Sequence, residues 1–261
     1  MMHHRRGNCV FRLLKLKPPN GWNSVAWELV IVTLGVLLAL GAQQLAETVN
    51  QRREAADTRA ALTNEIRETL AILELRRAAQ RCIDKRLSEV RAIVNEWGRT
   101  GSFETPSWVS QATWFAVGTH RFEAAQSAGR LALLSSEEQY RFGLVVGGLR
   151  NFQGVQVREI DAWSTLRMLQ SGVESLSPTD RTAVRVALQN ASTLNYLAKI
   201  NVGQTLQQAE SYGWQPDMRR ARQTMRLAWK GGRFMPTIGL TIDTPPEQAN
   251  RETNMIYELP E

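Results

Sequence analysis

The first strong feature of the chain is a stretch without any charged residue, from Leu29 to Ala46, in which most side chains are apolar. An α-helix rises 1.5 Å per residue, so this stretch covers about 27 Å, close to the hydrocarbon thickness of a bilayer. The residues from 25 to 28 extend it, with Glu28 at the edge as an interfacial carboxylate. The competing interpretation makes Glu28 a functional acid within the membrane. The pattern predicts a transmembrane helix over residues 25–46.

The charges on either side of this segment predict its orientation. Five bases precede it: Arg5, Arg6, Arg12, Lys15 and Lys17. After it, Arg52 and Arg53 are offset by Glu47 and Glu54. The positive-inside rule then keeps a basic tail, residues 1–24, in the cytoplasm and sends the remainder outside. This predicts a protein of the bacterial inner membrane with a periplasmic C-terminal domain.

A cleaved signal peptide is the competing interpretation, with Ala39–Gly41 as a small-x-small cleavage site. The 28 residues before the apolar segment and the helical pattern that continues through the site favour an anchor.

Beyond the anchor, apolar residues recur at spacings of three and four, which indicates a helix with one buried face. They are Leu62, Ile66, Leu70, Leu73, Ile83, Leu87, Val90, Val94 and Trp97. Because no Pro or Gly falls between Ala42 and Trp97, one long helix is predicted, ending at Gly98. A loop over 98–107 and a shorter apolar helix over Trp108–His120 should follow.

Two later helices carry start signals. Ser135 and Glu138 form the pattern of a capping box, and Ser177-Pro178 places Pro at a first helical position. Glycines such as Gly147 and Gly148 indicate a kink or close helix packing in the first of them. A last helix should follow Pro216.

These elements predict an all-α protein, in which one N-terminal transmembrane helix continues into a long helix of an antiparallel helical bundle. The predicted divisions are a cytoplasmic basic tail (1–24), the transmembrane helix (25–46), an outer helical bundle (47–235) and an irregular C-terminal tail (236–261).

The net charge of +7 invites a nucleic-acid interpretation, but the excess is concentrated at the N-terminus. Residues 1–46 hold five bases and one acid, which is +4, and residues 47–261 hold the other 27 bases and 24 acids, which is +3. The outer region therefore has the mixed surface of a solvated domain, and nucleic acid is not expected as a partner.

Two stretches carry a resemblance to a known group. Glu28, six mostly apolar residues and Gly35–Leu40 (GVLLAL) form the first, and Ala128–Leu134 (AGRLALL) the second. They resemble the anchor and the interhelical Ser-Gly-x-Leu-x-Leu-Ile turn of a family of uncharacterised bacterial single-pass membrane proteins, with Ala128 in place of Ser. The resemblance covers about fifteen residues directly and implies the topology and a helical outer domain. It implies no activity.

Catalytic and cofactor chemistry finds little support. His3 and His4 lie on the inner tail, which leaves His120 alone outside, so a His-rich metal site is excluded. There is no nucleophile elbow, P-loop or dinucleotide fingerprint. Cys82 is interpreted as a buried small hydrophobe, with a disulfide to a second copy as the alternative. We expect no enzyme, no metal and no cofactor.

One basic cluster is the candidate binding site. Six bases lie within fifteen residues, with Asp217 the only nearby acid: Arg219, Arg220, Arg222, Arg226, Lys230 and Arg233. With Met and Trp between them, they form the pattern of a basic amphipathic helix suited to anionic headgroups, an acidic partner or a carboxylate ligand. The competing interpretation is a solvated helix face.

The leading function class is a membrane-anchored interaction or scaffold protein, whose partners are the lipid bilayer and either another protein or a second copy. The alternative is a ligand-sensing outer domain that acts through a partner, and an enzyme of unrecognised type comes third. A buried pocket ringed by Arg would favour ligand binding, whereas an exposed apolar face would favour interaction.

Overall fold

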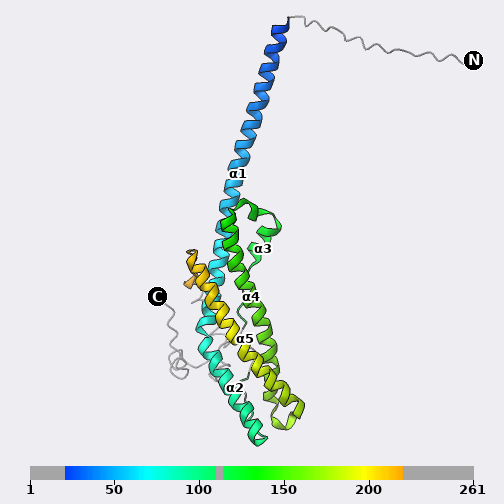
Figure 1. The fold of residues 1–261 in the computed structure, drawn as a ribbon, viewed down its shortest axis with the longest axis vertical. Helices are drawn as coiled ribbons and strands as arrows, with labels where there is room; N and C mark the ends of the chain where they lie inside the picture. The colour runs from blue at the N-terminus through cyan, green and yellow to red at the C-terminus, as the bar shows by residue number, and fades with distance from the viewer. Residues whose placement is uncertain (1–20, 110–113, 220–261) are drawn as a thin grey trace, which may run out of the picture. The chain divides into compact units, whose positions relative to one another are not determined.

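The structure is a computed structural model that describes residues 21–109 and 114–219, except for the side chains of Trp22, Arg81 and Cys82. Its helices are α1 (Trp22–Ala78), α2 (Gln80–Thr100), α3 (His120–Ser127), α4 (Ser136–Leu166) and α5 (Pro178–Ser211). Short 3-10 turns occupy Arg130–Leu133, Arg167–Ser171 and Val173–Ser175. No strand occurs among the described residues, so the predicted all-α class is confirmed (Figure 1).

The chain divides into two compact units, residues 1–53 and 54–261, and α1 contributes to both. In the first unit, α1 includes the one described segment that is long and apolar enough to cross a membrane, and none of it is buried. Leu29 and Leu38, for example, are 68% and 66% exposed. A core helix of a soluble protein would be mostly buried, so this exposure fits a helix whose surroundings are lipid.

In the second unit, the predicted apolar stripe forms the core. Its buried members are Leu62, Ile66, Leu70, Leu73, Leu87, Val90, Val94 and Trp97. The long helix is interrupted only at Ala79. The helical hydrogen bonds continue there, because Ala79 N donates to Leu75 O (3.0 Å) and Ala79 O accepts from Ile83 N (3.1 Å). The stripe was therefore interpreted correctly along both α1 and α2.

Helix α2 ends later than predicted. It passes Gly98 and stops at Gly101, which adopts φ 80° and donates its N–H to Trp97 O. Gly98 instead lies where α5 approaches: a Cβ there would come within 2.9 Å of the Arg185 guanidinium. A side chain at 98 would therefore require the Arg185 guanidinium to move, whereas the glycine at 101 ends the helix.

The predicted capping box at Ser135 is present, and the helix start predicted at Ser177-Pro178 carries a second box. The Ser135 hydroxyl accepts from Glu138 N (3.2 Å), and the Glu138 carboxylate accepts from Ser135 N (3.0 Å). The same reciprocal pair links Ser177 and Asp180 at the start of α5. Each box satisfies backbone groups that a helix start leaves without a partner.

The helices do not all alternate in direction. Arg59 and Arg76 of α1 pair with Glu138 and Glu159 of α4, in the same order along both helices. Helices α1 and α4 therefore run parallel, which corrects the fully antiparallel bundle. A parallel pair needs a long connection, and between α2 and α4 the chain includes the described residues 101–109 and 114–119, which form no helix, besides the short α3.

Helix α5 runs antiparallel to α2 and α4, as expected. Arg91 contacts Ser192 (3.2 Å), and Arg181 donates to Gly98 O (3.1 Å), so the pairing order reverses. Against α4, the predicted close packing is found at Gly148, where a Cβ would lie 2.4 Å from the Thr205 hydroxyl.

The helix predicted over Trp108–His120 is wrong. The described residues 101–109 and 114–119 have no regular structure, and α3 begins only at His120, which the sequence suggested as a helix end. Burial alternates here: Phe115, Val117 and Thr119 are buried, and the residues between them are not. An apolar stretch with spacing two cannot form one buried face of a helix.

A side chain from α1 starts α3. The Glu65 carboxylate accepts from the backbone N–H of Arg121 (2.7 Å) and of Phe122 (3.0 Å). These are unpaired donors of the first turn, so Glu65 acts as a cap supplied by another helix. No local sequence signal marks such a cap, and this explains the misplaced boundary.

The contact between Arg59 and Glu138 predicts an acid sensitivity. The Arg59 guanidinium, helped by Ser135, lowers the pKa of Glu138 from 4.5 to about 2. The Glu138 carboxylate binds a proton less readily in the folded state than in the unfolded state. The ionised carboxylate therefore stabilises the fold above pH 4.5, and this stabilisation is lost as the pH falls toward 2. In Glu138→Gln, the free energy of unfolding, measured by urea titration at several pH values, should fall less steeply as the pH is lowered. The exposed neighbour variant Glu137→Gln should leave the slope unchanged, and equal slopes for all three proteins would contradict the assignment.

Candidate functional site: the Arg76 cluster and the pocket beside it

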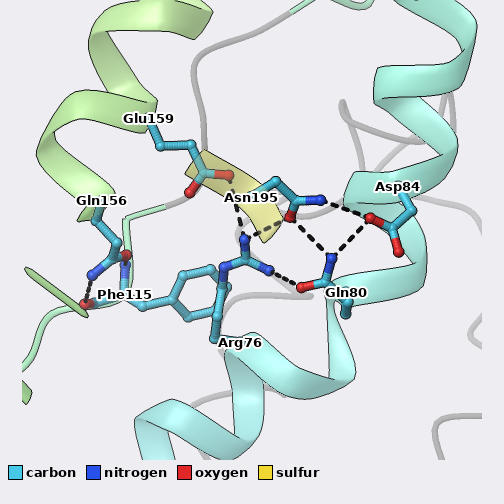
Figure 2. Close-up of polar contacts among 7 residues, drawn as sticks. All are labelled: Arg76, Gln80, Asp84, Phe115, Gln156, Glu159 and Asn195. Carbon is cyan, nitrogen blue, oxygen red and sulfur yellow. Dashed lines mark hydrogen bonds and ion pairs between the residues drawn. The ribbon is translucent and has the colours of Figure 1, made fainter. Parts of the chain in front are cut away.

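The most unusual group in the second unit is a buried arginine. Arg76, near the end of α1, is 1% exposed. Its guanidinium donates to Gln80 Oε1 (2.8 Å), Asn195 Oδ1 (2.9 Å) and Glu159 Oε1 (3.3 Å), which come from α2, α5 and α4 (Figure 2). One side chain therefore links all the long helices of this unit.

Two amides extend this contact into a network, which we call the Arg76 cluster: Arg76, Gln80, Asp84, Glu159 and Asn195. Gln80 Nε2 donates to Asp84 Oδ1 (2.8 Å) and Asn195 Oδ1 (3.0 Å), and Asn195 Nδ2 donates to Asp84 Oδ1 (2.7 Å). Turning either amide over would put donor against donor, so the network fixes both orientations. Asp84 Oδ1 is held by two N–H groups.

Burial sets the electrostatics of the cluster. It raises the pKa of Glu159, an effect that the Arg76 guanidinium opposes. Burial also lowers the pKa of Arg76, and Glu159 and Asp84 oppose that change. A buried charge is tolerated only when paired and hydrogen-bonded, so the two groups depend on each other. Replacing one alone leaves the other uncompensated.

A second buried amide anchors the irregular segment. Gln156 of α4 donates to Phe115 O (2.9 Å) and accepts from Phe115 N (2.9 Å), so one side chain satisfies both backbone groups (Figure 2). The Phe115 ring in turn lies 6.0 Å from the Arg76 guanidinium carbon. This contact closes one side of the cluster with an aromatic wall.

A pocket of about 380 Å³ opens on the other side of the cluster. Its lining is Arg76, Arg77, Gln80, Asp84, Lys199, Val202 and Gly203. Arg77 is half-exposed and pairs with Glu74 (2.6 Å). Burial raises the pKa of Glu74, and the Arg77 guanidinium opposes this effect only in part. The pocket thus has a buried polar floor and a charged rim.

A wider groove of about 740 Å³ lies between α4 and α5. It is lined by Arg158, Asp161, Ala162, Thr165, Ala183, Val186, Ala187, Gln189, Asn190, Thr193, Leu194 and Leu197. Helical spacing of three, four or seven places Leu144, Gly147, Gly154 and Ile200 along the same side of the two helices. We call this surface the α4–α5 face.

The basic cluster of the sequence lies mostly outside the described residues. Arg220, Arg222, Arg226, Lys230 and Arg233 fall there, as do the two tails and Cys9. Arg219 is described: it is exposed, and its N–H donates to Asp217 Oδ1 (3.1 Å). The binding role of the cluster stays a prediction.

The chain before Arg219 is tied to α1. Asp217 N donates to Arg67 O (3.0 Å), and Arg67 Nε donates to Gln215 O (3.3 Å). The start of the basic cluster therefore lies close to Arg67 of α1. Among the described residues, no group of three His, Cys, Asp or Glu side chains lies close enough to hold a metal ion.

Sequence reasoning missed the Arg76 cluster, although a signal exists. Arg76 lies three residues after Leu73, and Glu159 lies four before Trp163, so both occupy apolar positions of their helices. When a charged residue occupies a helix position at which the spacing predicts a buried apolar side chain, a buried ion pair is indicated. The pairing across helices cannot be inferred from one sequence.

Comparison with known protein families, curated proteins and solved structures found no match. The resemblance noted in the sequence stays a prediction.

Proposed function

We propose that this is a membrane-anchored interaction protein of the bacterial inner membrane, whose periplasmic helical domain self-associates through the α4–α5 face. The charge asymmetry around residues 25–46 supports the orientation. The exposed helix of the first unit supports the anchor. The observation that carries the proposal is the α4–α5 face, a groove bordered by exposed apolar side chains that no other described part of the chain covers.

The apolar character of this face is the first argument. Val186 is 52% exposed, Leu197 40% and Ile200 37%. They follow one another along a single side of α5 and border the groove against α4. Polar residues such as Asn190 and Thr193 lie between them, so the face combines exposed apolar and polar side chains, as interaction sites do.

Glycines on the same face are the second argument. A Cβ at Gly147 or Gly154 would meet no atom within 4 Å, so packing within the chain does not require glycine at either position. Glycine inside a helix costs about 0.5–1 kcal/mol relative to alanine. Close approach of a helix from a second copy would explain glycine at these positions, because glycine has no side chain to keep the two backbones apart.

Unpaired charges favour a second copy as the occupant. Among the described residues, Arg158 and Asp161 have no ion-pair partner, and they lie one helical turn apart on the groove. In a symmetric dimer, Arg158 of one copy meets Asp161 of the other, and the reverse pair forms as well. Anchoring keeps both copies in one plane, which raises their effective concentration.

Cysteine crosslinking in intact membranes tests this proposal. The native cysteines are replaced by Cys9→Ser and Cys82→Ala, and Asn190→Cys then places one thiol in the groove. An oxidant added from outside should give a band at twice the 29.4 kDa monomer mass. Ser164→Cys, exposed on α4 away from the groove, is the matched control and should stay monomeric.

A glycine variant tests the requirement for close approach. Gly154→Leu should reduce crosslinking at Asn190→Cys severalfold while the domain stays folded, because the added side chain enters open space. Gly203→Leu, at another open position on α5, should not reduce it. A monomer with Asn190→Cys, or equal crosslinking in both glycine variants, would overturn the proposal.

The second candidate function is a ligand-sensing outer domain that acts through a partner. The pocket beside the Arg76 cluster is the observation that favours it, because a buried arginine forms its floor.

A further inference from the structure

The pocket beside the Arg76 cluster has a rigid floor. Arg76 and Gln80 are held by the network described above, in which every polar group of Gln80 has a partner. Its walls come from α1–α2 on one side and from α5 on the other. A volume of about 380 Å³ lies within the range of small-molecule sites.

One acceptor in the pocket remains open. Asp84 accepts both amide hydrogen bonds with Oδ1, and Oδ2 receives none from the described residues. Figure 2 shows this second oxygen directed away from Gln80 and Asn195. Because Asp84 is exposed and oriented by its neighbours, it presents a fixed negative charge at the rim.

A cation lies on the opposite wall. Lys199 of α5 is exposed and forms no ion pair within the described chain, with Asp84 or any other carboxylate. Arg77 adds a second positive group, already paired with Glu74. The rim therefore carries opposite charges that do not neutralise each other directly.

We infer that this pocket binds a small zwitterion of the amino-acid type. Its ammonium group meets Asp84 Oδ2, and its carboxylate meets Lys199 and Arg77. The side chain lies against Val202 and the open space at Gly203, where a Cβ would meet no atom within 4 Å. The two halves of the ligand contact Asp84 and Lys199 at once, neither of which forms a salt bridge among the described residues, and a simple anion or amine can contact only one of them.

This inference supplies a ligand class for the second candidate function, and it stands whether or not the chain self-associates. The test uses the full-length protein in nanodiscs and the twenty standard L-amino acids as probes. At least one should bind by calorimetry and raise the Tm. For a binding L-valine, 3-methylbutanoate lacks only the ammonium and isobutylamine only the carboxylate. Each fragment should bind at least about tenfold more weakly, because each loses a charge-assisted hydrogen bond.

Variants locate the binding. Asp84→Asn keeps an oxygen acceptor for Gln80 and Asn195 but removes the charge, and Lys199→Gln removes the opposite one. Each should weaken binding at least about tenfold. Gly203→Leu should abolish binding by filling the pocket, and circular dichroism verifies its fold. Gly154→Leu, the same change on the α4–α5 face, should bind normally.

Two results would overturn the inference. The first is the absence of binding by all twenty amino acids at 10 mM. The second is unchanged affinity in both Asp84→Asn and Gly203→Leu, or equal affinity of the carboxylate fragment. The crosslinking experiment tests the α4–α5 face, whereas the binding experiment tests the pocket. A negative result in one therefore does not contradict the other proposal.

Discussion

Leu70→Asp should unfold the second unit, whereas Arg67→Asp, one turn earlier on α1, should leave it folded. Leu70 is 0% exposed in the core, so aspartate there would bury a charge without a partner and remove apolar contacts. We expect a loss above about 4 kcal/mol, among the largest that single substitutions cause. Arg67 is exposed and donates one hydrogen bond, to Gln215 O.

Urea denaturation followed by circular dichroism measures this difference. Loss of the bond to Gln215 should cost Arg67→Asp no more than about 1.5 kcal/mol. Similar transition midpoints for the two variants would show that Leu70 does not face a packed core.

Arg76→Met should destabilise the domain by about 3–5 kcal/mol, because it leaves the Glu159 carboxylate buried without its partner. Glu159→Met should have a cost of the same order, for the reciprocal reason. The double variant should lose much less than the sum, since two apolar side chains then replace two charges.

The coupling energy from this double-mutant cycle is the decisive measurement. Arg130→Met is the control, because Arg130 pairs with Glu54 at 3.0 Å on the surface and should cost under about 1 kcal/mol. Additive effects of Arg76→Met and Glu159→Met would mean that the two groups do not support each other.

Helix periodicity and capping chemistry predicted most of the fold, because both are encoded within a few residues. The stripe from Leu62 to Trp97 and the box at Ser135 needed no knowledge of the rest of the chain. The start of α3 could not be found this way, since its cap is Glu65, 55 residues before His120. Contacts over such separations depend on the assembled structure.

The candidate sites show the same division. The sequence directed attention to Arg219–Arg233, where like charges lie close along the chain. The pocket instead combines Asp84 with Lys199, and a single base and acid so far apart give no local signal. What the sequence did offer was the phase of Arg76 and Glu159 within apolar stripes. That phase identifies buried charges without identifying their partners.

The segment that holds Phe115 has a consequence for the order of folding. Its backbone partners are side chains of α1 and α4: Thr69 for Gly118, Gln156 for Phe115 and Glu65 for Arg121. Each bond involves one helix only, so all three exist together only when α1 and α4 lie side by side, and parallel helices meet only after a long loop has closed. We therefore expect the crossover between them to be completed late in folding. In that order, α4 and α5, which are neighbours in sequence, would pair before α1 joins them.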